Sequence, residues 1–399
     1  MFVTIGVSDP DRRRGVPVDA AESLAEHLAS AAVVDHHCHG IMRGEVSSEQ
    51  FAALATESDW PQPPGGDVFD SPVGVAIRAR CAPELGIARH ASAGEYLSTR
   101  AALGEAEVRR RLLQAAKIGT YLVDTGHRSD DVLDPDELAS VTGGRAFDVA
   151  RLEPIAESIA RDGISPADFF DTFAQRLHDA LETAVGVKSV IAYRFDLDFD
   201  PTRPTEAEVR VAAERWFARA ANANAWRLDE PALLRAILWA AVDAGKPIQM
   251  HVGYGDSDIV LNRCDPTKMT DFLRLTVGSG TPIMLLHNYP FIREAGYLSQ
   301  VYPHVYLDTG AAVGYTGAAS LSLIRQSLEL TPFSKLLFST DAFGLPELYL
   351  LGSQLMREGL FKVVGGWVES DEIAQRDALR LLEMVLSKNA RRVYGLVDA

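Results

Sequence analysis

The chain has 399 residues, of which 47% are hydrophobic and 24% charged, and its formal net charge is −16 with a pI near 5.1. This length suits one large barrel or two or three ordinary domains. The negative charge argues against nucleic acids and anionic membranes as partners, because basic patches bind both. We therefore expect a small molecule as the partner.

The expected compartment is the cytoplasm. Three cysteines without paired spacing indicate a reducing environment and no disulfide framework. The start of the chain, "MFVTIGVSDPDRRRG", does not have the pattern of a signal peptide. No apolar run reaches the roughly 18 residues that a transmembrane helix needs.

A unit recurs along the chain: a short apolar run, a polar or ionisable residue, and a stretch with helical periodicity. Short apolar runs bounded by turn residues are typical of buried parallel strands. We find eight of them, at 33–37, 118–126, 145–152, 187–194, 247–251, 282–287, 304–308 and 335–341. Eight alternations of strand and helix predict an α/β fold of the (β/α)₈ TIM-barrel type. An open doubly wound sheet is the alternative, but it needs a glycine-rich loop where the chain has "HHCHG".

We expect residues 1–399 to form a single barrel domain with two long connections. A mainly helical insertion follows the first strand at about 41–117, and another connection spans about 195–246. Because both follow the carboxyl ends of strands, they are predicted to lie over the barrel mouth as lids. Amphipathic helices are predicted within 166–185 and 229–245.

Ionisable or ligating residues stand at the ends of all eight predicted strands. In a TIM barrel the catalytic side chains come from these ends, whereas packing alone does not explain such a pattern. The residues are His37 with His39, Asp124, Arg151, Arg194, His251, His287, Asp308 and Asp341.

The stretch "VVDHHCHG" has the spacing of a metal site. Alternate residues of a strand face the same side, so His37 and His39 share one face and His36 turns outward with Cys38. His251 and Asp341 complete a set of three imidazoles and one carboxylate. A lone histidine at a strand end is more often a hydrogen-bonded core residue, but the combination favours Zn²⁺, with Fe²⁺ or Mn²⁺ as alternatives.

Several motifs resemble those of the amidohydrolase superfamily. "VVDHHCH" resembles its D-x-H-x-H strand, and "IQMHVGYGDSD", "IMLLHNYPFIREAGYLSQVYPHVYLD" and "KLLFSTDAFGLPELYLLGS" resemble the amidohydrolase-2 branch. The similarity is greatest to the amidohydrolase half of FluG-type proteins and runs from about residue 30 onward. It implies metal ligation by His37, His39, His251 and Asp341, with His287 as a catalytic residue beside them.

The resemblance also raises the question of how many metal ions bind. Many members of the superfamily carry a carboxylated lysine that ends strand four and bridges two metals. Here Lys188 lies five positions before Tyr193, which is roughly 16 Å along an extended strand. We therefore expect Lys188 at the opposite end of the barrel and a single divalent ion.

The predicted activity is metal-dependent hydrolysis of a C–N bond in a small carboxylated substrate, with γ-glutamyl amides as candidates. Asp341 is predicted to transfer a proton from the attacking water, and His287 to polarise the scissile carbonyl. The predicted substrate-binding residues are Arg194, Tyr193 and Glu347. For Arg194 an ion pair with Asp308 or Glu294 is an equal alternative, and for Glu347 a place at a helix N-terminus is the alternative.

Two other functions stay open at this point. Non-oxidative decarboxylation uses the same ligand set in other members of the branch, and a barrel without catalysis could serve as a regulatory protein. The sequence does not identify the substrate or the metal, and it leaves open whether the chain forms a homo-oligomer.

Overall fold

The computed structural model describes residues 18–397. The segment on which the signal-peptide prediction depends lies outside these residues. Within 18–397, no helix combines the length and the apolar character that crossing a membrane requires.

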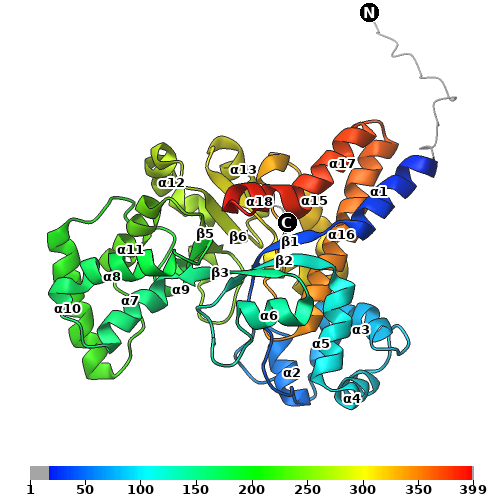
Figure 1. The fold of residues 1–399 in the computed structure, drawn as a ribbon, viewed down its shortest axis with the longest axis horizontal. Helices are drawn as coiled ribbons and strands as arrows, with labels where there is room; N and C mark the ends of the chain where they lie inside the picture. The colour runs from blue at the N-terminus through cyan, green and yellow to red at the C-terminus, as the bar shows by residue number, and fades with distance from the viewer. Residues whose placement is uncertain (1–17, 398–399) are drawn as a thin grey trace, which may run out of the picture.

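Seven parallel strands form one sheet in which each strand pairs with the next along the chain (Figure 1). All seven contain the apolar runs read from the sequence, which suit strands covered on both faces. They are β1 (Val33–Cys38), β2 (Ile118–Asp124), β3 (Arg145–Arg151), β4 (Gly186–Ser189), β5 (Ile248–Val252), β6 (Ile283–His287) and β7 (Val305–Leu307).

The eighth predicted run is an extended segment, 336–342, that joins β7 to β1. On one side Leu307 and Leu336 form a parallel bridge. On the other side the His36 N–H donates to Phe338 O at 3.0 Å. These contacts close the sheet, and the predicted (β/α)₈ barrel is confirmed.

Helices surround the sheet. The predicted amphipathic stretches form α8 and α11, so both helix predictions are confirmed. The helices outside the first insertion are α1 (Val18–Ser30), α6 (Pro135–Thr142), α7 (Leu152–Arg161), α8 (Phe169–Ala180), α9 (Ile191–Arg194), α10 (Glu206–Ala223), α11 (Pro231–Ala244), α12 (Thr270–Thr276), α13 (Ile292–Val301), α14 (Gly310–Thr316), α15 (Ser320–Ser327), α16 (Pro346–Glu369), α17 (Gln375–Glu383) and α18 (Asn389–Tyr394).

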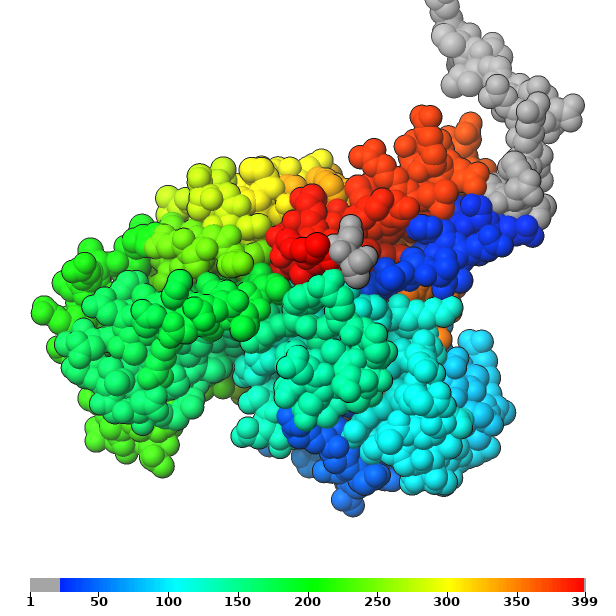
Figure 2. Space-filling view, in the orientation of Figure 1, coloured from blue at the N-terminus to red at the C-terminus, as the bar shows by residue number. Residues whose placement is uncertain are grey.

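The insertion at 41–117 is mainly helical, as predicted. Its helices are α2 (Ser48–Leu54), α3 (Pro72–Glu84), α4 (Ala93–Leu103) and α5 (Glu105–Ala116). Because α3 and α5 pack against α16, much of the insertion covers the outside of the barrel. The insertion contributes residues of the stretch 53–59 to the lining of the cavity described below. The connection at 195–246 contributes Arg227 to the same lining. In Figure 2 the two connections belong to separate lobes with a notch between them.

An apolar cluster fills the interior of the barrel at the end opposite the cavity. It combines inward side chains of the strands, such as Val34, Leu122 and Leu286, with Tyr394 and Leu396. The ring of Tyr394 lies beside Gly186, the first residue of β4. The segment around α18 therefore plugs the amino-terminal end of the strands.

Candidate metal centre and active-site cavity

The strand that carries the three histidines is bulged. Asp35 pairs with Tyr121 and Cys38 with Val123, so three steps along β1 match two steps along β2. One extra residue of this kind interrupts the alternation of a strand. His36 is consequently fully buried and bonded through Nε2 to a carboxylate at 2.8 Å. The expectation that His36 turns outward is wrong, although its hydrogen-bonding role was anticipated.

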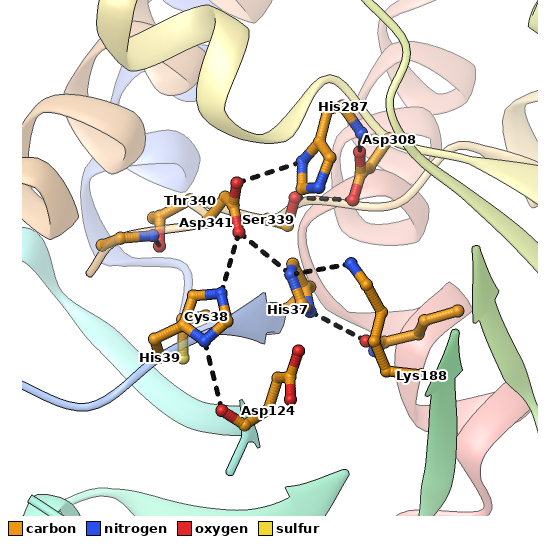
Figure 3. Close-up of polar contacts among 12 residues, drawn as sticks. His37, Cys38, His39, Asp124, Lys188, His287, Asp308, Ser339, Thr340 and Asp341 are labelled. Atoms are coloured by element: carbon orange, nitrogen blue, oxygen red, sulfur yellow. Dashed lines mark hydrogen bonds and ion pairs between the residues drawn. The ribbon is translucent and has the colours of Figure 1, made fainter. Parts of the chain in front are cut away.

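His37, His39 and Asp341 come together where β1 and segment 336–342 end (Figure 3). Their candidate ligand atoms all lie within 4.8 Å of one another. Asp341 Oδ1 is 2.9 Å from His37 Nε2 and 3.4 Å from His39 Nε2. His39 Nδ1 is 3.1 Å from the backbone oxygen of Asp124, which can only accept, so Nε2 of His39 carries the lone pair.

His251 and His287 lie next to this group, near the ends of β5 and β6. Their ring centroids are 4.7 Å apart, and His287 Nδ1 is 3.3 Å from Asp341 Oδ2. Both side chains are buried, yet within residues 18–397 His251 Nε2 has no hydrogen-bond partner, and the contact of His287 Nδ1 with Asp341 has an ion-pair distance without hydrogen-bond geometry. Unpartnered buried nitrogens are uncommon in folded proteins and indicate a missing ligand.

The donor set fits a divalent transition metal. Burial, followed by the charge of Lys188, lowers the pKa of His37 to about 4. Burial also holds the pKa values of His251 and His287 well below the usual range for histidine. The imidazoles are therefore neutral at neutral pH, which is the form that binds metals alongside a carboxylate.

Backbone strain coincides with the predicted catalytic residues. His287 and Asp341 have φ angles of 66° and 52°, in the left-handed region that costs a non-glycine residue about 1–2 kcal/mol. Hydrogen bonds hold both. The His287 N–H donates to Asp308 Oδ1 at 2.6 Å, and Thr340, before Asp341, donates its N–H and hydroxyl to Asp35 at 2.9 and 2.5 Å. Strain maintained in this way is typical of functional sites.

Lys188 lies inside the site, so its predicted place at the opposite end of the barrel is wrong. Strand β4 ends at Ser189, and a helical turn, α9, follows it. Lys188 is therefore next to the carboxyl end of the strand, with Nζ 3.4 Å from His37 Nε2. Burial, opposed by the charges of Asp124 and Asp341, lowers the pKa of Lys188 to about 8. The reason for expecting a single ion is thereby removed.

Tyr193 and Arg194 line the cavity from α9 instead of ending a strand. The ring centroid of Tyr193 is 4.4 Å from that of His251. Arg194 Nη2 is 3.2 Å from Glu157, which is neither of the two carboxylates considered from the sequence. Arg194 thus forms an ion pair with Glu157 and also lines the cavity.

Glu347 does not line the cavity. It is fully buried in the first turn of α16, where its Oε1 accepts from the Tyr96 hydroxyl at 2.9 Å and from Arg100 Nε at 2.8 Å. Both partners belong to α4, so the insertion covers this carboxylate. Its predicted role in substrate binding is not compatible with this position, and the alternative at a helix N-terminus describes it better.

The cavity has a volume of about 370 Å³ and is also lined by residues that no strand-end pattern marks. Glu57, from the first insertion, is the most unusual of them. Burial, followed by the charge of Asp341, raises the pKa of Glu57 to about 7. The others include His127, Arg227, Tyr254, Tyr315 and Phe343. Tyr315 belongs to α14 and the others to connections, where no strand-end pattern in the sequence would have identified them.

A closed parallel barrel with histidines and an aspartate at its carboxyl end defines a class of metal-binding enzyme scaffold. Residues 121–396 match the sequence model of the family described as Amidohydrolase. That match covers more than half of the chain, and the chain belongs to this family.

Individual proteins agree with the assignment. The chain is 29% identical over 411 residues to Protein fluG of Emericella nidulans, and the match covers 94% of the chain but only 47% of that protein. A crystal structure from Lactobacillus casei ATCC 334, provisionally assigned as a metal-dependent hydrolase, is 26% identical with a TM-score of 0.82, covering 93% of this chain and 97% of that one. A uronate isomerase from Bacillus halodurans C-125 shares the fold at 14% identity and a TM-score of 0.63, covering 95% and 96% of the two chains.

Proposed function

We propose that this protein hydrolyses a C–N bond of a small carboxylated substrate, with γ-glutamyl amides as the candidate class. Its family makes it an amidohydrolase-type enzyme with a metal centre. The observation that supports hydrolysis most directly is the position of Asp341. This carboxylate contacts His37, His39 and His287 and also lines the cavity.

The metal would be held by His37, His39, His251 and Asp341. A divalent ion bound there supplies a Lewis acid and an activated water at neutral pH. Asp341 accepts the proton of the attacking water and returns it to the leaving nitrogen. His287 stabilises the negative charge that develops on the carbonyl oxygen.

Positive side chains in the lining of the cavity support a carboxylated substrate. Arg194, Arg227 and Lys188 all line it. The ion pair of Arg194 with Glu157 is made through Nη2, and a guanidinium has five N–H donors in all. Arg194 can therefore keep this partner and still donate to a substrate carboxylate.

The test is a set of activity assays on the full chain loaded separately with Zn²⁺, Fe²⁺ and Mn²⁺. γ-Glutamyl amides and N-acyl amino acids are assayed for release of amine, and aromatic carboxylic acids for release of CO₂. We expect amine release by the wild type and none by Asp341→Asn. Release of CO₂ without amine would replace hydrolysis by decarboxylation. Full metal loading without either product would favour a non-catalytic barrel.

A further inference from the structure

A buried amide lies directly behind one of the predicted metal ligands. Gln249, on β5, is fully buried, with Oε1 2.8 Å from His37 Nδ1 and Nε2 2.7 Å from the backbone oxygen of His36. A peptide oxygen can only accept, so the amide atom that faces it is the NH₂ group. Turning the amide round would set two acceptor oxygens against each other. The orientation of Gln249 is therefore determined, and its Oε1 faces His37.

This orientation decides which nitrogen of His37 carries the proton. Because Oε1 of Gln249 only accepts, Nδ1 of His37 is the N–H donor. A neutral imidazole has one N–H and one lone pair, so Nε2 of His37 has the lone pair. Nε2 is also the atom that lies 2.9 Å from Asp341 Oδ1, so in this tautomer two acceptor atoms face each other, as two ligands of one cation do. The opposite tautomer would place a proton where the metal binds.

Tyr394 continues the chain of hydrogen bonds from the plugged end of the barrel. Its hydroxyl is 2.9 Å from Gln249 Nε2 and 3.1 Å from His36 Nδ1. The second hydrogen of the amide points to this oxygen, so the hydroxyl accepts from Gln249 and donates its own proton to His36. Nε2 of His36 then donates to Asp308 Oδ2 at 2.8 Å, since a carboxylate only accepts.

Asp308 connects the same chain to the second catalytic histidine. Its Oδ2 also accepts from the Ser339 hydroxyl at 2.6 Å, and its Oδ1 accepts the backbone N–H of His287 at 2.6 Å. The series Asp308, His36, Tyr394, Gln249, His37 thus has one consistent set of proton positions. All five side chains lie in the barrel interior, with little or no exposure to solvent.

We propose that Gln249 and Tyr394 are positioning residues of the metal centre, which fix the tautomer of His37 so that Nε2 presents its lone pair to the ion. His36 and Asp308 anchor the far end of this chain. The proposal rests on metal binding at His37 but on neither the reaction nor the substrate. A residue that orients a metal ligand in this way typically contributes 10–100-fold to metal affinity.

The first test removes one hydroxyl at a time. Tyr394→Phe breaks the chain of hydrogen bonds. Tyr306→Phe is the matched control, because Tyr306 belongs to the same apolar cluster and its hydroxyl accepts from Arg392 at 3.3 Å, outside the chain that leads to His37. Zn²⁺ affinity of the full chain is measured by competition with a chromophoric chelator. We expect Tyr394→Phe and Gln249→Leu to weaken Zn²⁺ binding by about 10–100-fold, and Tyr306→Phe by less than about twofold. Equal affinities for the two tyrosine variants would overturn the proposal.

The second test reads the proton positions directly. In metal-free wild-type protein with ¹⁵N-labelled histidine, ring nitrogen shifts are expected to show the proton of His37 on Nδ1 and that of His36 on Nε2. In Tyr394→Phe we expect the proton of His36 to stay on Nε2, because Asp308 Oδ2 still only accepts, and the shift of its Nδ1 to move, because that nitrogen loses its hydrogen bond. A proton on Nε2 of metal-free His37 would overturn the proposal even if a variant loses metal through poor folding. Neither test uses a substrate, so this proposal and the proposed hydrolysis can fail separately.

Discussion

Two buried polar clusters in this chain show opposite ways of satisfying charge. Around Glu347, Arg100 contacts two carboxylates, at 2.8 Å to Glu347 and 3.1 Å to Glu105, and Tyr96 adds a hydroxyl. One oxygen of Glu347 lacks a hydrogen-bond partner, but Arg100 supplies the opposite charge that the carboxylate needs. This cluster is complete within the chain and ties the insertion to α16.

The cluster around Asp341 is not complete in that sense. Burial keeps the imidazoles of His37, His251 and His287 neutral. Within residues 18–397, His251 Nε2 has no hydrogen-bond partner, and His287 Nδ1 has an ion-pair contact with Asp341 at 3.3 Å without a hydrogen bond. The difference teaches that burial and charge alone do not identify a functional site. The informative feature is a set of donor atoms that converge on one point and whose partners the chain does not provide.

The largest expected effect comes from removing the carboxylate at the centre of the incomplete cluster. Asp341→Ala should abolish stoichiometric metal binding and lower activity by about 10³-fold or more, because a ligand and a proton acceptor are lost together. Metal content and the rate of amine release measure this. Glu347→Gln, which alters a carboxylate of the other cluster, should retain metal and activity. Loss of metal from Glu347→Gln alone would contradict the comparison.

The complete cluster is expected to govern stability instead. Arg100→Met leaves the buried carboxylate of Glu347 without its cation and Glu105 with Arg109 alone, at 4.0 Å, and should lower the free energy of unfolding by about 3–5 kcal/mol. Urea denaturation measures the change. Arg110→Met, on the same insertion, is the control, because an exposed pair such as Arg110 with Glu107 contributes about 0–1 kcal/mol. Similar decreases in the free energy of unfolding for both variants would show that the buried cluster contributes no more stability than an exposed ion pair.

A substitution of Lys188 tests whether this residue is part of the metal centre. We expect Lys188→Met to lower kcat/KM by about 10²-fold, the size typical for loss of a charged or donor group at the reacting centre. Lys335→Met is the control, because Lys335 donates to the backbone oxygens of Ser299 and Tyr302 and is not part of the cavity lining. Metal ions per chain are counted for both variants. Wild-type kinetics in Lys188→Met would restrict the centre to the histidines and Asp341.

The smallest expected effect concerns Glu57 and pH. Its pKa rises from 4.5 to about 7 on folding, so its favourable contribution exists below pH 4.5 and is lost as the pH rises through 7. Relative to wild type, metal-free Glu57→Gln should therefore gain about 1–2 kcal/mol of stability between pH 5 and pH 8, a discounted value because the side chain is only partly buried. Urea denaturation at several pH values measures this, with exposed Glu49→Gln as the control. A difference that does not change with pH would contradict it.

Site residues at the ends of clearly marked strands could be predicted from the sequence. His37, His39, His251, His287 and Asp341 each stand at or just beyond the end of a predicted strand, and the fold brings such ends together. The end of β4 was predicted wrongly, because a buried strand and a short buried helix share the same apolar pattern. The strand ends where Glu153 accepts from the Ser189 hydroxyl and the Val190 N–H, at 2.8 and 2.9 Å, and that contact across 36 residues has no local signal.

The remaining differences also depend on contacts between distant segments. The bulge in β1 leaves no mark in the amino-acid composition of the strand. The alternation of side chains along a regular strand therefore could not predict that His36 faces inward. Whether Glu347 faces a substrate or a protein helix is decided by where α4 packs. Glu57 and Arg227 line the cavity from two long connections, where no strand-end pattern marks them.

The hydroxyl of Tyr394 has a consequence for the order of biosynthesis. It bonds His36, which was synthesised 358 residues earlier, and the hydrogen-bond chain behind His37 is complete only when the two meet. Before residue 394 is translated, His36 Nδ1 and the second amide hydrogen of Gln249 do not have the partner that they share in the folded chain. Correct metal loading should therefore follow translation of residue 394, and a nascent chain arrested before that point should bind Zn²⁺ weakly.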